Sequence, residues 1–493
     1  MGGTQGSVGA GEHSRDGPPH ASSAACRNLS AFQCAAVLAT GGGLGGLVFM
    51  RPELIPVLTI AGAAAAFLAL SLWRIVLVVL SATPPDAAVQ GGRDLPPYSI
   101  LVALYDEAEV MEQLVARLAR IDYPADRLQG LLVLEAHDAA TLAAAERAAR
   151  PDWLKVFVAP PGGPGTKPRA LNCALRHVTG AFVTVYDAED EPHPLQLREA
   201  VARFAADRSG RLACLQAPLR IRPGGAEPGG SRFLGRQFAA EYASLFETAL
   251  PGLARLGLPF PLGGTSNHFR TEALRRAGGW DAFNVTEDAD LGFRLWAGGW
   301  RLGVLGRPTW ETPPERLVDW LPQRTRWLKG YMQTFGVHSR RPWRLGARGA
   351  FALLATVGVG IVSAAIHGPS LAWMMAAVLV SAAAGLAPGT PLLSVGVLLL
   401  GAASAWLSCA VGARRAGVPY RLNDMLAAPV YWGLQSLAAA HAGWRLVREP
   451  FAWDKTPHRR DPPAAAKAAH AALYETAPDR LSAGHAAAPQ PVA

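Results

Sequence analysis

The chain has 493 residues, of which 50% are hydrophobic and only 17% are charged. Soluble globular proteins usually contain about 25% charged residues, so this composition argues against a disordered chain and against a purely soluble enzyme. The net charge of +9 is a modest excess, and no compact basic run with interleaved aromatic residues indicates a nucleic-acid partner. We therefore expect one catalytic domain combined with membrane helices.

Two apolar stretches follow a start of about thirty residues that is rich in Gly, Ser, Ala and His. Residues 1–30 show no periodicity, which predicts a disordered N-terminus. The stretches 31–50 and 54–80 are each long enough for the roughly 20 residues that cross a membrane core. We predict two transmembrane helices over residues 31–80.

A second apolar block covers residues 349–447. Arginines cluster before it and after it, so both flanks are expected in the cytoplasm, which requires an even number of spans. We predict about four transmembrane or interfacial helices here, over 349–366, 371–386, 391–411 and 425–447. This topology puts Arg414, Arg415 and Arg421 outside, unless the last stretch is an interfacial helix. The basic, Ala/Pro-rich tail 448–493 is expected to be cytoplasmic and disordered.

The five cysteines are scattered and form no CxxC pair, so the sequence predicts neither a disulfide framework nor a zinc site.

Residues 81–348, between the two apolar blocks, have the composition of a soluble domain. Short apolar runs at 98–104, 128–134, 154–158 and 181–186 alternate with helical patterns, which predicts a parallel sheet. Three of these runs end in acidic residues, at the sheet edge where α/β proteins bind ligands. The acids of the second run include Asp138, for which a helix N-cap is the alternative interpretation.

Two further acidic motifs and one helix complete the pattern. Asp187 and Glu189 leave a strand two residues apart, as ligands of Mg²⁺ or Mn²⁺ often do. Asp288 lies in an acidic stretch that opens a helix, preceded by the polar turn Gly264-Thr265-Ser266. An amphipathic interface helix is predicted near 316–338, with Gln323, Arg326 and Trp327 on one face.

The motifs YDAED (186–190), TED (286–288) and QRTRW (323–327) occur in this order between the apolar blocks. In this pattern the chain resembles the inverting glycosyltransferase family 2, and most of all its processive membrane synthases of cellulose, hyaluronan and exopolysaccharides. The resemblance implies an α/β GT-A catalytic domain with a Rossmann-like mixed sheet, embedded between transmembrane α-helices. It also implies a nucleotide-sugar donor and Mg²⁺ or Mn²⁺ as the cofactor.

The same resemblance implies roles for single residues. It assigns donor binding to Tyr105, Glu107, Glu135 or Asp138, Lys167, Asp187 and Gln216. It assigns the metal to Asp187 and Glu189, with Asp190 sharing that role, and the general base to Asp288, beside Glu287. Gln323, Arg326 and Trp327 are expected at the acceptor and the diphosphate, with Gly264, Thr265 and Ser266 facing the acceptor sugar. The stretch 451–456 resembles the gating loop of cellulose synthases.

These inferences predict an enzyme of a bacterial-type plasma membrane, multi-pass, with its catalytic domain in the cytoplasm. We expect it to transfer a sugar from a donor such as UDP-glucose to a growing β-linked polysaccharide and to export the product. Expected partners are the donor, a polysaccharide or lipid-linked acceptor, membrane lipid, and export or regulatory subunits. The alternatives are transfer of one sugar to a lipid carrier and a catalytically silent binding subunit of an export complex.

Overall fold

The apolar runs that predict strands pair into one sheet in the computed structural model, which describes residues 24–25, 28–51, 53–81, 94–222, 230–385 and 392–452. They form β1 (Tyr98–Leu104), β2 (Leu128–Glu135), β3 (Leu154–Ala159) and β4 (Phe182–Tyr186), each within one residue of its predicted bounds. These strands lie parallel in the order β3-β2-β1-β4, so their carboxyl ends share one edge.

Antiparallel pairing makes the sheet mixed. β8 (Asn267–Arg270) runs antiparallel between β4 and β6 (Leu212–Gln216), and β9 (Arg301–Val304) closes the seven-stranded sheet beside β6. A second sheet joins three short strands, β5 (Glu191–Pro192), β10 (Thr309–Glu311) and β7 (Leu219–Ile221). This mixed α/β sheet is the one expected for a GT-A domain.

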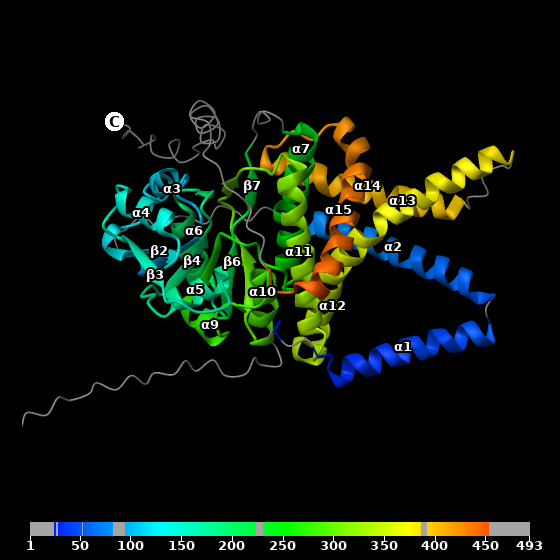
Figure 1. Cartoon of the computed structure of the whole chain (residues 1–493), viewed down its shortest axis with the longest axis horizontal. Helices are drawn as coiled ribbons and strands as arrows, with labels where there is room; N and C mark the ends of the chain where they lie inside the picture. Colours follow the sequence, from blue (N-terminus) through cyan, green and yellow to red (C-terminus); the bar gives the residue numbers. More distant parts are fainter. Residues whose placement is uncertain are drawn as a thin grey trace, which may run out of the picture.

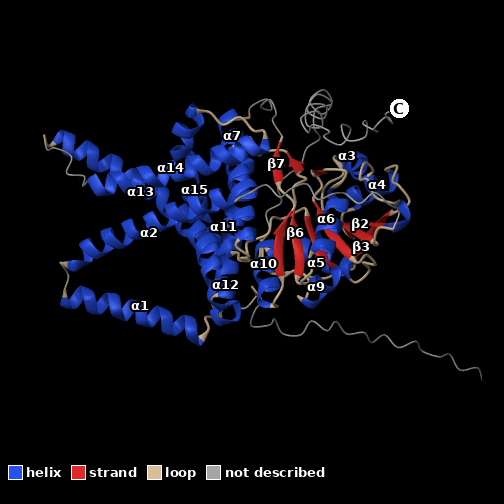
Figure 2. Ribbon diagram, turned by 180° about the vertical axis from the view of Figure 1, so that it is seen from behind, coloured by secondary structure: helices blue, strands red, loops and turns tan. Residues whose placement is uncertain are grey.

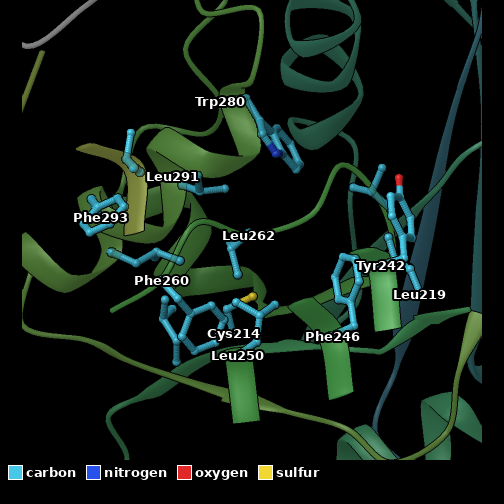
Figure 3. Packing of buried hydrophobic residues seen from close by; sticks show 14 of the residues in the cluster. Cys214, Leu219, Tyr242, Phe246, Leu250, Phe260, Leu262, Trp280, Leu291 and Phe293 are labelled. Atoms are coloured by element: carbon cyan, nitrogen blue, oxygen red, sulfur yellow. The ribbon is translucent and has the colours of Figure 1, made fainter. Parts of the chain in front are cut away.

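Helices surround the large sheet (Figures 1 and 2). They are α3 (Met111–Leu118), the short η1 (Ala125–Arg127), α4 (Ala139–Arg147), α5 (Lys167–Leu175), α6 (Gln196–Ala206), α9 (Thr271–Arg276) and α10 (Glu287–Ala297). Figure 3 shows the apolar packing behind α10, where Leu291 and Phe293 lie near Phe260 and Leu262. Trp280 is buried in the same cluster and makes an edge contact with Phe269, so the Gly-Gly-Trp turn has a packing role.

A wall of helices separates the sheet domain from the outer helices. It comprises α7 (Arg232–Ser244), a π-helical turn (Leu245–Ala249), α8 (Leu250–Arg255) and α11 (Leu317–His338). The bounds of α11 match the amphipathic helix predicted near 316–338. This helix lies between the sheet domain and the outer helices in both views (Figures 1 and 2).

The outer helices are α1 (Ala31–Met50), α2 (Leu54–Leu80), η3 (Pro342–Leu345), α12 (Gly346–Leu353), a π-helical turn (Leu354–Gly358), α13 (Val359–Ala383), α14 (Leu392–Ala416) and α15 (Leu422–Arg448). Within the described residues, two helical stretches are long and apolar enough to cross a membrane, Ala31–Met50 and Pro342–Ala383. A shorter apolar helix covers Ala64–Leu80. Figure 1 shows α1, α2 and α13 extending away from the sheet domain, whereas α15 lies alongside α11.

The separate helices predicted at 349–366 and 371–386 are wrong, because one helical run continues through His367, Gly368 and Pro369. Proline inside a helix lacks an N–H and crowds the preceding turn, so a break was the sequence expectation. Ser436 of α15 repairs this turn: its hydroxyl accepts a bond from the Gly368 N–H at 2.8 Å and donates to the Ala364 carbonyl at 2.6 Å. A side chain from a neighbouring helix thus keeps the helix continuous past Pro369.

The basic loop between α14 and α15, predicted from the sequence to lie outside, contacts the helical wall. Arg415 donates to the carbonyl of Glu247, on the helical wall, at 2.7 Å and to Ser81 Oγ at 2.8 Å. Arg236 of α7 pairs with Asp424, near the start of α15, at 2.9 Å. The ends of α14 and α15 that this loop joins therefore pack against α7 and the π-helical turn that follows it.

Part of the start predicted to be disordered contacts the sheet domain. The Ala24 N–H donates to Asp281 Oδ2 at 2.7 Å, and Ser30 caps α1 and donates to the Arg340 carbonyl at 3.2 Å. The predictions for residues 1–23, 26–27 and 453–493, including most of the stretch likened to a gating loop, lie outside the described residues.

Candidate active site

A cleft of about 360 Å³ opens at the carboxyl ends of β1, β2 and β4 and extends to α10 and α11. It brings together thirteen of the residues expected at the site: Tyr105, Glu107, Glu135, Lys167, Asp187, Glu189, Gly264, Thr265, Glu287, Asp288, Gln323, Arg326 and Trp327. The position follows from the parallel sheet, because strands that run the same way end at the same edge.

One end of the cleft carries aromatic and acidic groups. The rings of Tyr105 and His137 lie 5.5 Å apart at this end, and a planar base could stack on them. Glu135 lines the cleft and lies 3.7 Å from the guanidinium of Arg169. Asp138 instead caps α4, accepting from the Thr141 N–H at 3.1 Å, so it is the structural carboxylate of the two candidates.

Lys167, at the first turn of α5, forms the polar centre of the cleft. Its ammonium group donates to Asp187 Oδ1 and, at 2.9 Å, to the carbonyl of Gly264. Burial alone would lower the pKa of Lys167, but the carboxylates of Asp187 and Glu287 outweigh it and raise that pKa. Lys167 therefore stays charged and is available to a bound phosphate.

Asp190 lies beneath the cleft and does not line it, contrary to its expected share in metal binding. Its carboxylate accepts from the Thr265 hydroxyl and, at 2.7 Å, from the Asp187 N–H. Burial, together with the charge of Asp187, raises the pKa of Asp190 to about 8. Asp190 thus holds the loop that presents Asp187 and Glu189.

No group of three or more His, Cys, Asp or Glu within the described residues has the arrangement of a complete metal site. The two carboxylates that follow β4 and line the cleft, Asp187 and Glu189, still provide the oxygen donors that Mg²⁺ or Mn²⁺ takes when substrate phosphates complete its coordination. Glu311 also lines the cleft, and burial together with the charges of Asp190 and Glu189 raises its pKa well above the usual range. The crowding of carboxyl groups that raises this pKa would be relieved by a divalent cation bound beside Asp187 and Glu189.

The polar turn before β8 is shaped by Gln216, which is buried and outside the cleft. Its side chain accepts from the Gly263 N–H at 2.7 Å and donates to the Thr265 carbonyl at 3.0 Å. Ser266 is also buried, with a left-handed φ of 56°, and donates to Thr309 Oγ1 at 2.6 Å. Both residues position the turn, so Gly264 and Thr265 face the cleft from this turn and Ser266 does not.

Glu287 and Asp288 begin α10 and face Lys167 across the cleft. Burial, with the charge of Asp288, raises the pKa of Glu287 to about 7, and burial also raises the pKa of Asp288. A carboxylate with a raised pKa is a stronger base than a free aspartate, which is what proton abstraction from a hydroxyl requires.

Close packing against α11 fixes the start of α10. A Cβ at Gly330 would lie only 2.3 Å from Thr286 Oγ1, so only glycine lets this turn approach α11. Gln333 accepts from the Val285 N–H at 3.1 Å, and Asn284 donates to Thr334 Oγ1 at 3.1 Å. These contacts hold Asp288 opposite the motif on α11.

That motif divides between the two sides of α11. Gln323, Arg326 and Trp327 line the cleft, whereas Arg324 is buried and forms two bonds to Glu241, at 2.9 and 2.7 Å. The Arg324 guanidinium also lies 4.6 Å from the centre of the Trp327 ring. The Arg324–Glu241 pair therefore supports the indole from behind.

Among the residues that line this cleft without having been expected from their motifs are His137, Tyr242, Glu311 and Tyr331. The position of His137 at the cleft could have been predicted, because this residue lies between the two acids at the end of the second predicted strand. Glu311 carries no such signal, since its three-residue strand is recognisable only from its pairing with β5 and β7.

Comparison with known families agrees with this geometry. Residues 99–243 match glycosyl transferase family 2, and residues 182–407 match glycosyl transferase family group 2. The similar solved structures include a mannosyltransferase from Pyrobaculum calidifontis in complex with GDP-Man and Mn²⁺. It is 21% identical, with a TM-score of 0.51 over 79% of this chain and 98% of that one, and this similarity supports the fold alone.

Two curated relatives illustrate the range of similar proteins. A beta-monoglucosyldiacylglycerol synthase from Synechocystis is 30% identical over 268 residues, 52% of this chain and 54% of that relative. A cellulose synthase catalytic subunit from Komagataeibacter xylinus is 26% identical over 249 residues, 49% of this chain and 32% of that relative. The chain spans about half the length of the glycolipid synthases that it matches and about a third of the cellulose synthase.

Proposed function

We propose that the chain, which matches models of glycosyltransferase family 2, transfers a sugar in this cleft from a nucleotide sugar to an acceptor hydroxyl, with inversion at the anomeric carbon. One observation carries this proposal. Asp288 on α10, Lys167 on α5 and the carboxylates after β4 face one cleft, although they are far apart in sequence. An acid–base group and a diphosphate-binding group are thereby placed in one cavity.

Asp288 has the role of general base. Its half-buried carboxylate would take the proton of the acceptor hydroxyl as that oxygen attacks the anomeric carbon. The bond from this carbon to the diphosphate oxygen breaks on the opposite face, so one displacement inverts the configuration. A Cβ added at Gly264 would come into van der Waals contact with Asp288 Oδ2, at 3.5 Å, so the missing side chain at Gly264 keeps this carboxylate open to the cleft.

Lys167 and Arg326 have the role of stabilising the departing diphosphate. Their positive charges line the cleft on the side of the nucleotide, where negative charge develops during the transfer. Asp187 and Glu189 would hold Mg²⁺ or Mn²⁺, and this ion supplies additional neutralisation of the diphosphate when bound. The nucleotide base would stack at Tyr105 and His137.

The outer helices support a location in a membrane. Large apolar side chains on α1 and α13 remain exposed, among them Leu38 at 74%, Phe49 at 88%, Trp373 at 77% and Leu379 at 67%. An apolar surface of this extent needs a cover, and lipid is the cover that fits helices of this length. We propose that α1, α2, α13 and α14 span the membrane and leave the catalytic domain in the cytoplasm.

We propose that α15 lies in the membrane surface. One face of it is exposed and apolar, with Leu426, Val430, Leu437, Trp444 and Val447 between 56% and 76% exposed. Its opposite face packs against α11 and α13, as expected of an amphipathic helix at the interface. The acceptor end of the cleft, at Trp327, thus lies close to lipid.

A membrane lipid is the acceptor that this arrangement favours, with one sugar added in each reaction. Trp327 offers a flat apolar face, and the walls formed by Tyr242, Leu245 and Phe246 are apolar as well. The relative from Synechocystis, named for a glucosyldiacylglycerol product, supports this choice. UDP-glucose is the donor we propose to test first.

Elongation and export of a β-linked polysaccharide is the second candidate. The joint presence of Gln323, Arg326 and Trp327 in the cleft supports it, as does the similarity to a cellulose synthase subunit. Export would require a passage among the outer helices, and the position of α15 beside α11 leaves fewer helices for it.

Product analysis distinguishes these proposals. The full chain in vesicles containing diacylglycerol is given radiolabelled UDP-glucose, UDP-N-acetylglucosamine or GDP-mannose with Mn²⁺, and the products are separated into lipid extract and polymer. A lipid bearing one sugar supports the first proposal, whereas a long polymer replaces it with the second. If the full chain consumes none of these donors, transfer of these sugars is excluded.

A further inference from the structure

A second cavity, distinct from the cleft, lies at the other ends of α10 and α11 and has a volume of about 740 Å³. Five arginines and one histidine line it: Arg276, Arg294, Arg340, Arg341, Arg344 and His338. No carboxylate is among the described residues that line it. An excess of positive charge in a concave site favours an anionic ligand.

The positive charge of this cavity is only partly neutralised. Arg276 pairs with Glu272 at 2.5 Å, and Arg294 donates to Asp290 at 2.6 Å and to the Ala277 carbonyl at 2.7 Å. The remaining nitrogen of Arg294, Nη2, is buried and has no hydrogen-bond partner among the described residues. A buried donor of this kind would gain from an acceptor oxygen supplied by a ligand.

Arg341 and Arg344 are exposed at the rim of the cavity. Within the described part of the chain, neither guanidinium forms an ion pair or a hydrogen bond. Arginine binds phosphate oxygens in a bidentate manner, and such charge-assisted bonds are stronger than neutral ones. The rim therefore offers two binding groups to a phosphate.

The walls of the cavity are fixed by contacts of their own. Trp296 Nε1 donates to the Leu345 carbonyl at 2.9 Å, which anchors the end of η3, the segment that carries Arg344, to α10. His338 Nε2 lies 2.9 Å from Asp290 Oδ1 and joins the end of α11 to α10. Because these walls are already in place, a ligand would bind without ordering them first.

The cavity lies where the chain would enter the membrane. Its rim is continuous with η3, from which the long apolar stretch to Ala383 departs. Phe32, at the start of α1, contacts Trp343 with ring centres 5.6 Å apart, and Trp343 is 62% exposed. Exposed aromatic side chains at the base of apolar helices are typical of the headgroup level of a bilayer.

We propose that this cavity binds the phosphate of an anionic phospholipid headgroup, with Arg341 and Arg344 at its rim and Arg294 in its interior. The proposal rests on the membrane location proposed above, and not on the identity of the sugar or the acceptor. The bound phosphate accepts hydrogen bonds from the three guanidinium groups while the acyl chains stay in the bilayer beside α1. The lipid thereby anchors the two ends of α10 and α11 that lie farthest from the cleft.

Thermal unfolding of the full chain in detergent tests this site without any transfer reaction. The probes are short-chain phosphatidylglycerol, short-chain phosphatidylcholine and inorganic phosphate, each titrated while the melting temperature is followed. A ligand of the folded state raises the melting temperature in proportion to its occupancy. We expect phosphatidylglycerol to raise it and the other two to have little effect.

The variant R341Q–R344Q should weaken binding of phosphatidylglycerol by about ten-fold or more, the effect of losing charge-assisted hydrogen bonds. Both side chains are exposed, so the variant should fold as the wild type does. R147Q–R208Q removes the same charge from exposed positions on the sheet domain and should bind as the wild type. Equal binding by R341Q–R344Q, or no response to phosphatidylglycerol, would overturn the site. An equal response to inorganic phosphate would make it a site for free phosphate and overturn the lipid assignment.

Discussion

Gly330→Ala is a small change that tests whether contact between α11 and the turn before α10 positions Asp288. In the structure, the added Cβ would lie 2.3 Å from Thr286 Oγ1, 2.5 Å from its Cγ2 and 2.7 Å from its Cβ. Ordinary contacts between such atoms are about 3.5–4 Å, so the two segments would have to separate by about 1 Å. Rotation of Thr286 cannot relieve this clash, because its Cβ takes part in it.

The expected loss of activity is larger than the expected loss of stability. A displacement of about 1 Å at a reacting group can lower the rate by about 100-fold, which corresponds to about 2.7 kcal/mol in the barrier. Overpacking lowers the free energy of unfolding by about 1–3 kcal/mol, whereas replacement of a helical glycine by alanine raises it by up to about 1 kcal/mol. We therefore expect a folded protein with a strongly reduced turnover number.

The assay is initial-rate glycosyl transfer by the full chain in vesicles, with the melting temperature measured on the same preparation. Gly336→Ala is the matched control, because Gly336 lies on the same helix and an added Cβ there meets nothing within 4 Å. The control should keep the wild-type rate. Wild-type turnover in Gly330→Ala would refute the proposal that this contact positions the base.

Three further predictions follow from the geometry of the cleft. Burial raises the pKa of Asp288 and brings that of Glu287 to about 7, so the transfer rate should fall as the pH drops below neutrality. Glu287→Gln removes a negative charge beside Asp288 and should move this fall in rate to lower pH. An unchanged pH–rate profile in this variant would contradict the prediction. Glu241→Ala leaves the buried Arg324 without its bidentate partner and should lower the free energy of unfolding by about 2–3 kcal/mol. This loss is smaller than for a fully buried pair, because a third of the Glu241 side chain is exposed. An unchanged melting temperature would count against a role of the Arg324–Glu241 pair in supporting Trp327. EDTA should suppress transfer and added Mn²⁺ should restore it, whereas full activity in EDTA would exclude the metal.

The fold could be predicted where a local pattern is sufficient. β1, β2 and β4 are largely apolar runs of five to eight residues, because the sheet buries both of their faces, whereas β3 lies at the edge of the sheet and is partly exposed. The strands β5, β7 and β10 have only two or three residues and owe their existence to pairing with one another. Strands of two or three residues are too short to show the alternation of apolar and polar residues from which a strand is predicted.

The same limit applies to the outer helices. Pro369 is a correct local signal for a break, but the hydroxyl of Ser436 on another helix keeps the helix continuous. The position of α15 beside α11 likewise depends on packing across the fold, including the bond from Trp320 Nε1 to Tyr431 Oη at 3.2 Å. Hydropathy and charge counts describe one segment at a time and do not contain these contacts.

Within the candidate site, the sequence correctly predicted which motifs lie together at the cleft. It was less successful in predicting which residue of each motif faces the cleft. Glu189 lines the cleft and the adjacent Asp190 does not, because Asp190 accepts bonds from Thr265 and from the Asp187 backbone. Ser266 is turned away for a similar reason, through its bond to Thr309. Which side chain of a motif faces the cleft depends on hydrogen-bond partners from other parts of the chain, and these partners are not part of the motif.

The central claim is that Asp288 is the base of an inverting transfer. Comparison of Asp288→Asn with the wild type, measuring sugar transfer and donor binding on the same preparation, tests it most directly. Asparagine keeps the shape of the side chain and removes its basicity, so transfer should fall by about 100-fold or more while the dissociation constant of the nucleotide sugar changes little. Transfer at the wild-type rate by Asp288→Asn would contradict the claim.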